Sequence, residues 1–170
     1  MISDANKGIT SISYNHLNLP TEVKFNGSNT QKINYTYAAN GIKLEKVVND
    51  NGAVTTTDYL GNYIYENNVL KQFSHSEGYV KPDGSGGFDY IYNYLDHLGN
   101  VRLTYSDLDG NGSINASTEI LQERNYYPFG MLHSGYNSNI VGVENNHQTY
   151  NGKELNESLG LNVIEMDFRQ

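Results

Sequence analysis

Cysteine and tryptophan are absent from this chain of 170 residues, and proline occurs only 3 times. Without cysteine the sequence excludes disulfide bonds, thiolate metal sites and a thiol nucleophile, although it leaves the cellular compartment open. Long apolar runs are missing too, and none approaches the roughly 20 residues that cross a bilayer. Residues 1–8 lack the pattern of a secretory signal peptide. We therefore expect no membrane insertion.

Positive charge is scarce and scattered. The 11 Lys and Arg are outnumbered by 19 Asp and Glu, which gives a net charge of −8. Binding to nucleic acid depends on clustered cations that neutralise phosphates, so we expect no DNA or RNA partner. Only 37% of the chain is hydrophobic, and 15 residues are tyrosines, which suit half-buried sheet faces. This composition predicts a thin sheet with little helix.

A loosely repeated unit joins paired tyrosines, a turn rich in Asn and Gly, and a returning apolar strand. The two clear copies place these residues at Tyr35, Tyr37, Gly41, Tyr92, Tyr94 and Gly99. Weaker copies lie at residues 14–23 and 59–70. A unit that cannot bury its own apolar face stacks on its neighbours, so the pattern predicts an all-β, antiparallel sheet built from repeated hairpins. The alternative is an ordinary meander whose hairpins share turn chemistry.

Four segments are less regular. Residues 120–126 favour a strand over a short helix, and residues 153–159 are compatible with a helical turn that ends at Gly160. Residues 76–87 are rich in glycine and predict an exposed hairpin tip or loop. Residues 134–148 predict a surface excursion that contains a short apolar patch.

One acidic segment is a candidate calcium site. It matches the opening of a calcium loop, with oxygen-bearing side chains at positions 1, 3 and 5 and Gly at position 6. The candidate ligands are Asp107, Asp109, Asn111, Ser113 and Glu119. The acid expected at position 12 falls on Thr118, and Glu119 comes one place late. The segment is therefore either a calcium-binding hairpin or a polar hairpin tip without an ion.

No combination of side chains predicts an enzyme. The histidines lie in different loops without the spacing of zinc ligands, at His16, His75, His97, His133 and His147. His133 precedes a serine that lacks a Gly-x-Ser-x-Gly elbow, and Glu144, Glu154 and Glu157 have no predicted cleft. His97 fits a structural cap better than a base. We assign no catalytic residue.

Four signatures in a fixed order resemble the YD-repeat, or Rhs-repeat, family where it enters its associated core domain. A Tyr-x-Tyr unit with its turn precedes Asp-His-Leu-Gly-Asn-Val-Arg at 96–102, Tyr-Tyr-Pro-Phe-Gly-Met at 126–131 and Tyr-Asn-Gly-Lys-Glu-Leu at 150–155. The residues that carry the resemblance are Tyr35, Tyr37, Gly41, Tyr92, Tyr94, Asp96, His97, Gly99, Asn100, Arg102, Tyr127, Pro128, Gly130, Gly152, Lys153 and Glu154. The signature at 96–102 is similar to those of large bacterial cell-surface or secreted proteins of the Bacteroidetes type.

The resemblance implies a segment of a β-sheet that spirals into a hollow shell, which in many members encloses a C-terminal toxin. It makes residues 1–89 the repeats and residues 90–170 the start of the core domain, continuous with them. It also implies a secreted or cell-surface location within a larger protein. In toxin-bearing members the core domain cuts itself from its cargo with downstream aspartates, which residues 1–170 do not contain. Autoproteolysis is therefore not assigned to these residues.

The leading functional hypothesis is a non-catalytic structural module that encapsulates or presents another polypeptide. The partner would be the remainder of its own polypeptide or a C-terminal cargo. One alternative is a calcium-stabilised adhesion or carbohydrate-binding module. A further alternative is part of an autoproteolytic core domain whose catalytic aspartates lie outside this chain. An open segment of sheet has two unpaired edges, so we also expect self-association.

Overall fold

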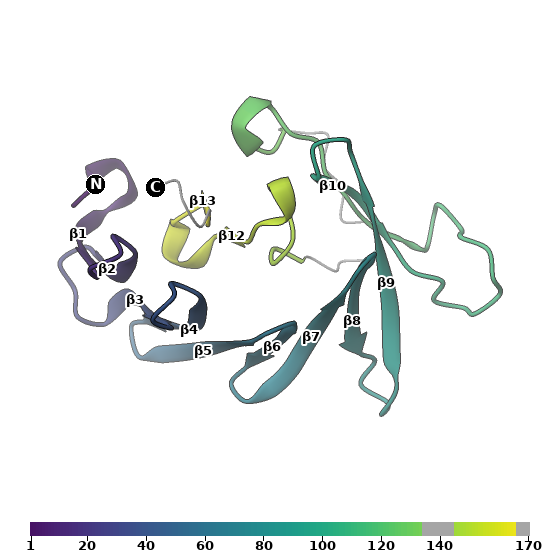
Figure 1. Ribbon diagram of the computed structural model, residues 1–170, viewed down its shortest axis with the longest axis horizontal. Coiled ribbons are helices and arrows are strands. Elements are labelled where there is room, and N and C mark those ends of the chain that lie inside the picture. The colour runs from purple at the N-terminus through teal and green to yellow at the C-terminus, as the bar shows by residue number, and fades with distance from the viewer. Residues whose placement is uncertain (134–144, 166–170) are drawn as a thin grey trace. The chain divides into compact units, whose positions relative to one another are not determined.

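The computed structural model describes residues 1–133 and 145–165. Eleven strands form one antiparallel sheet in which neighbours in the sheet are neighbours in the chain (Figure 1). In chain order they are β1 (Ile9–Tyr14), β2 (Pro20–Phe25), β3 (Gln31–Tyr37), β4 (Lys43–Asp50), β5 (Ala53–Leu60), β6 (Tyr63–Glu66), β7 (Val69–His75), β8 (Gly78–Pro82), β9 (Phe88–Leu95), β10 (Val101–Tyr105) and β11 (Ile120–Glu123). The prediction of an all-β, antiparallel sheet is confirmed.

Short elements complete the fold. A second sheet pairs β12 (Leu155–Asn156) with β13 (Val163–Ile164). Four single 3-10 turns are η1 (Ala5–Lys7), η2 (Pro128–Gly130), η3 (Tyr150–Gly152) and η4 (Ser158–Gly160). No helix in the described ranges is long and apolar enough to span a membrane.

The chain divides into two compact units. The first unit comprises residues 1–72 and 157–161, and the second comprises residues 73–156 and 162–170. These units reflect packing, whereas the predicted division at residues 1–89 and 90–170 reflects sequence signatures. That division stays a prediction.

One five-residue turn recurs along the chain. The amide of its first residue donates to the carbonyl of the fifth at 2.8–3.0 Å, and the fourth amide donates back to the first carbonyl at 2.9–3.4 Å. It spans residues 15–19, 38–42, 96–100, 127–131 and 149–153. The fourth residue always has positive φ, between 59° and 88°, at Asn18, Gly41, Gly99, Gly130 and Gly152. Glycine and asparagine tolerate this left-handed backbone, which explains why they recur there.

Three of these turns join strands that the sequence predicted as hairpins. They connect β1 to β2, β3 to β4, and β9 to β10. Side chains reinforce all three: Asn15 Oδ1 accepts from the amides of Leu17 and Leu19 at 2.9 and 3.0 Å, and in the second hairpin Asn40 Oδ1 accepts from the Ile42 amide at 3.2 Å. The Asp96 carboxylate does the same in the third hairpin. The hairpins predicted at residues 14–23 and 59–70 are likewise present.

The apolar core of the first unit lies on one face of β1–β3. Its buried side chains are Ile9, Val23, Phe25, Ile33, Tyr35 and Leu161. Leu161 comes from the end of the chain and follows η4, which packs against β3. Each fully buried aliphatic side chain contributes about 1.5–3 kcal/mol. The strands of the first unit thus depend on a segment far along the sequence to cover them.

In the second unit, side chains pack together on both faces of the strands. Tyr79, Ile91 and Leu121 form the buried cluster on one face. On the other face the Tyr92 ring stacks on Tyr105, with centroids 5.8 Å apart. Tyrosine rings therefore stack across strands here, while in the first unit Tyr35 stacks on Tyr37 of its own strand, 6.2 Å away.

Two local predictions need correction. Residues 76–87 are not one loop, because β8 occupies Gly78–Pro82 and only residues 83–87 form the tip. The glycines and the proline of this segment favoured a loop, and its buried pair, Tyr79 and Val80, is too short to show the periodicity of a strand. Gly78 allows the strands to approach closely, because a Cβ there would lie 2.1 Å from the Ile91 carbonyl oxygen. The helical turn expected at residues 153–159 is also displaced: Leu155–Asn156 is a strand, and the turn is η4.

Two further predictions have different outcomes. The strand favoured at residues 120–126 is confirmed as β11, although it ends at Glu123. Most of the predicted surface excursion at 134–148 lies outside the described residues.

We predict that the isolated chain self-associates through its sheet edges, because β1 and β11 each have one neighbour in the sheet. The Arg124 amide donates to the Arg102 carbonyl of β10, so the Glu123 amide points away from β10. Glu123→Pro should block pairing at this edge without breaking a bond to β10. Sedimentation should show mass rising with concentration, and less so in the variant. A monomer across the whole concentration range would contradict the prediction.

Candidate functional site

Three of the four sequence signatures meet in the second unit. The turn at 96–100 contacts the turn at 149–153, where Asn100 Oδ1 accepts from the Asn151 amide at 2.8 Å. Beside this bond, the Val101 amide donates to the Thr149 carbonyl at 3.2 Å. About fifty residues separate these partners in the sequence, and only the fold brings them together. We call this contact and the groups around it the signature junction.

The third signature joins through Tyr126 and Gly130. The Tyr126 hydroxyl donates to the Val101 carbonyl at 3.1 Å, and its ring meets the Tyr150 ring edge-on at 5.6 Å. A Cβ at Gly130 would lie 2.6 Å from Ile164 Cδ1 and 2.7 Å from the Tyr150 ring. Position 130 therefore requires glycine for two reasons: its φ is positive, and a Cβ would clash with Ile164 and Tyr150.

Charged side chains of the signature at 96–102 serve the backbone. Arg102 Nε donates to the Arg124 carbonyl at 2.8 Å, and Arg102 lies 3.7 Å from the Asp96 carboxylate. Partial desolvation raises the pKa of Asp96, but hydrogen bonds from Asn100 and from the Leu98 amide outweigh it and hold that pKa below its usual value. Asp96 is therefore the side chain that caps this turn.

The remaining signature residues differ in their exposure and in their place in the fold. His97, Tyr94 and Tyr127 are exposed, whereas Glu154 is buried. The Lys153 carbonyl accepts from both the amide and the hydroxyl of Thr149, so Lys153 closes its turn through its backbone. Tyr35, Tyr37 and Gly41 belong to the first unit and do not form part of the junction.

A buried arginine that sequence reasoning missed anchors the returning chain. Arg124 is only 2% exposed, and its Nη2 donates to the Asn145 carbonyl at 3.0 Å and to Asn146 Oδ1 at 2.8 Å. Tyr79 lies nearby, where burial raises its pKa to about 12. No motif marks Arg124. The only available signal was a basic residue inside the predicted strand at residues 120–126.

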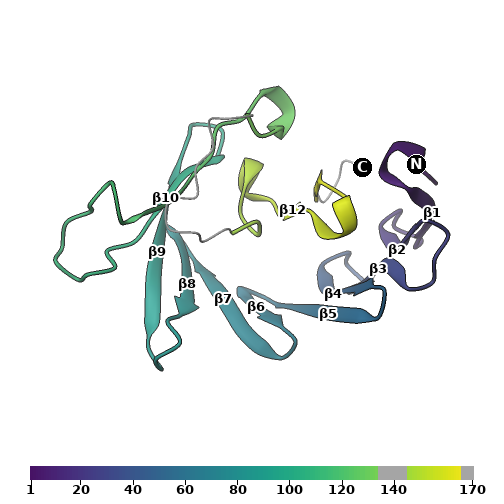
Figure 2. The same cartoon turned by 180° about the vertical axis from the view of Figure 1, so that it is seen from behind.

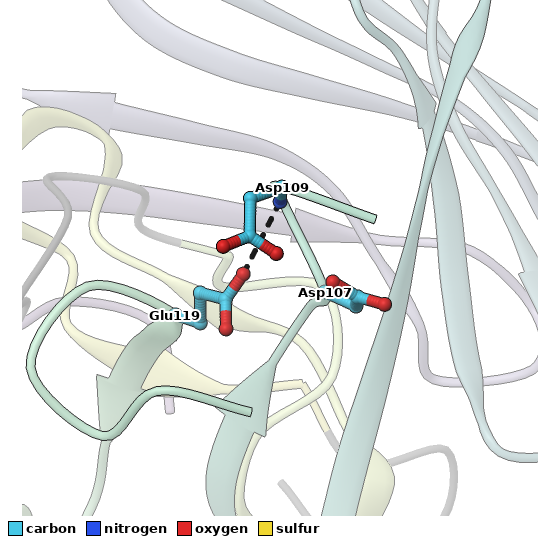
Figure 3. A group of neighbouring side chains, drawn as sticks. All are labelled: Asp107, Asp109 and Glu119. Carbon is cyan, nitrogen blue, oxygen red and sulfur yellow. Dashed lines mark hydrogen bonds between the residues drawn. The ribbon is translucent and has the colours of Figure 1, made fainter. Parts of the chain in front are cut away.

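The acidic loop between β10 and β11 brings its three carboxylates together. Oxygens of Asp107, Asp109 and Glu119 all lie within 4.8 Å of one another (Figure 3). The loop extends from the end of β10 in both views of the chain (Figures 1 and 2). The Ser106 amide donates to the Glu119 carbonyl at 3.1 Å, which closes the loop at its base.

Glu119 holds the loop from inside. Its side chain is 2% exposed; Oε1 accepts from the amides of Leu108 and Asp109 at 2.8 and 3.2 Å, and Oε2 accepts from Asn115 at 2.7 Å. Position 12 of an EF-hand pattern, Thr118, is exposed instead. Glu119 therefore lies beside Asp107 and Asp109, although it comes one residue after position 12 of the pattern.

The other two candidate ligands take part in hydrogen bonds of the loop. Asn111 Nδ2 donates to the Asp109 carboxylate at 2.7 Å, and Asn111 Oδ1 accepts from the Ser113 amide at 2.8 Å. The Asp107 carboxylate accepts from the amides of Asn111 and Gly112 at 3.1 and 2.8 Å. A hard cation prefers oxygen ligands, and these neighbouring carboxylate and amide oxygens are of that chemistry.

No protein-family model and no curated protein matches the chain. Solved structures do match. The crystal structure of TcdB2-TccC3 without its hypervariable C-terminal region is 17% identical over 89% of this chain, with a TM-score of 0.60. The Tc holotoxin pore of Photorhabdus luminescens is 16% identical over 88% of this chain, with a TM-score of 0.57. The chain has the fold of part of a Tc toxin. It spans only 8% of the length of each of these chains.

We predict that Gly130→Ala destabilises the chain far more than Gly99→Ala. Both glycines have positive φ, so either substitution should cost about 1–2 kcal/mol from the backbone. A Cβ at Gly99 meets nothing within 4 Å, whereas at Gly130 it meets Ile164 and Tyr150. Overpacking should add about 1–3 kcal/mol there. Urea unfolding measures both variants, and equal losses would show that the junction is not tightly packed.

We predict that calcium binds the acidic loop and stabilises the chain. Calorimetric titration with CaCl₂ after chelator treatment should release or absorb heat, and saturating metal should add about 2.7 kcal/mol at 100 times the dissociation constant. Combined Asp107→Ala and Asp109→Ala substitutions should abolish both effects. Asp83→Ala is the matched control, because Asp83 caps another hairpin tip. Absence of heat at millimolar metal, or unchanged heat in the double variant, would exclude the site.

Proposed function

We propose that this chain is a non-catalytic structural module of the Rhs type. In this proposal it forms a segment of a β-sheet shell in a larger secreted or cell-surface bacterial protein, which encapsulates or presents a C-terminal polypeptide. The observation that carries the proposal is the signature junction. Its most distinctive residues, Asn100, Arg102 and Gly130, make contacts to backbone or fit close packing.

The architecture supports the same proposal. Strands that follow one another in the sheet as in the chain can be extended hairpin by hairpin, because each new strand pairs with the one before it. The recurring five-residue turn supplies a repeated way to reverse the chain. The likeness to Tc toxin chains, over 8% of their length, fits a segment of a much larger assembly.

Scaffolding also explains the polar contacts of the second unit. Residues 145–156 are held on its strands by hydrogen bonds to Arg124, Asn100 and Asn93 rather than by a large apolar core. Such bonds fix register and orientation because each donor needs its own acceptor. We assign no catalytic role to these residues, and place any self-cleaving aspartates of a core domain outside this chain.

A second candidate function rests on the acidic loop and on exposed rings of β9. Phe88, Tyr90 and Tyr94 are exposed on that strand. With calcium fixing the loop, the chain would serve as an adhesion or carbohydrate-binding module. Glycan-array binding that chelator removes and CaCl₂ restores would support this candidate, and binding to no glycan would count against it.

We predict that the natural product containing residues 1–170 is a longer polypeptide with a protected C-terminal part. Antibodies raised against this chain would isolate the product from its source, and limited proteolysis followed by mass spectrometry would map the protected regions. The C-terminal part should resist protease until denaturant opens the sheet. A product that ends at residue 170, or one digested evenly along its length, would contradict the proposed function.

A further inference from the structure

The turn at 127–131 presents an apolar tip to solvent. Phe129 is 93% exposed, which is the highest value among the large hydrophobic side chains of the described residues. Met131 is 65% exposed, and Tyr127 lies beside them. A ring this exposed contributes little to the core, so packing within the chain does not explain why Phe129 is there.

The backbone of Phe129 is strained as well. Its φ is +71°, a left-handed conformation that bulky residues rarely adopt. In the turn at 149–153 the same position is occupied by Asn151, with a φ of +55°. Asparagine tolerates this conformation far better than phenylalanine. The turn therefore does not require an aromatic residue, and strain at an exposed ring points to a role outside the fold.

A hydrogen bond, a stacked ring pair and close packing hold the backbone of this turn in place. The Tyr127 amide donates to the Met131 carbonyl at 2.8 Å, and the Tyr127 ring stacks on His133 with centroids 4.1 Å apart. Gly130 is confined between Tyr150 and Ile164. A turn whose backbone is fixed in this way loses little backbone freedom when a partner covers its tip, which favours binding.

We propose that Phe129 and Met131 form an anchor for a polypeptide that exposes apolar side chains. Residues 125–133, which contain this turn, include no Asp, Glu, Lys or Arg, so contact of the turn with apolar groups desolvates no charge of its own. This segment has no Lys or Arg, and the whole chain has a net charge of −8. Both features disfavour binding of the turn to an anionic membrane surface. Methionine adapts to partners of different shape. The inference rests on the proposed function, because the partner is the polypeptide that the module holds.

The test compares Phe129→Gly with the unmodified chain. Glycine relieves the strain and removes the ring, so the thermal midpoint should rise by about 2–4 °C. Fluorescence anisotropy would measure binding to labelled, reduced and carboxymethylated α-lactalbumin, a permanently unfolded polypeptide. Affinity should fall about tenfold or more. Leu98→Asn, which removes an exposed apolar side chain (60% exposed) at the same position of the turn at 96–100, should leave affinity unchanged.

Several outcomes would overturn the anchor. A lower midpoint in Phe129→Gly would make the ring structural, and equal affinity, or no binding of the probe by the unmodified chain, would remove the proposed contact. Binding to phosphatidylglycerol vesicles that depends on Phe129 would assign the tip to a membrane instead. The shell itself is judged separately, since a protected C-terminal part in the natural product would uphold it even if Phe129 binds nothing.

Discussion

The left-handed residue at the fourth position of the five-residue turn is the constraint on which the rest of the structure depends. It lets the chain reverse with two backbone hydrogen bonds and no long loop, so successive strands pair in register. Where strands follow, as at Gly41 and Gly99, the turn builds the sheet. Where no strand of the large sheet follows, as at Gly130 and Gly152, the same turn packs against neighbouring turns.

This second use of the turn explains how the signature junction arises. A tight turn exposes its outer backbone groups, and Asn100 satisfies the Asn151 amide of a neighbouring turn. Tyr126 then satisfies the Val101 carbonyl. Because buried backbone groups need partners, each such bond specifies which turns meet. The junction is therefore an assembly of turns, in which Asn100 and Tyr126 pair with backbone groups and Gly130 allows close packing.

The sequence was sufficient to predict the hairpins, because alternation and Asn-Gly turns are local signals that Tyr35, Tyr37 and Gly41 display openly. It was insufficient for β8, whose buried residues are too few to show a period between Gly-rich flanks. Arg124 was missed for a different reason. Its partners lie some twenty residues away in the sequence, and no local pattern reports a contact that only tertiary packing creates.

The acidic loop shows why spacing along the sequence alone does not say which of its acids lie close together. An EF-hand count assumes that helices fix the ends of the loop, which places the last acid at position 12. Here strands fix the ends, and the bond between Ser106 and Glu119 sets where the loop closes. Glu119 thus turns inward because β11 begins beside it. Ligand spacing in a hairpin must be counted from the ladder that closes it, not from a helical template.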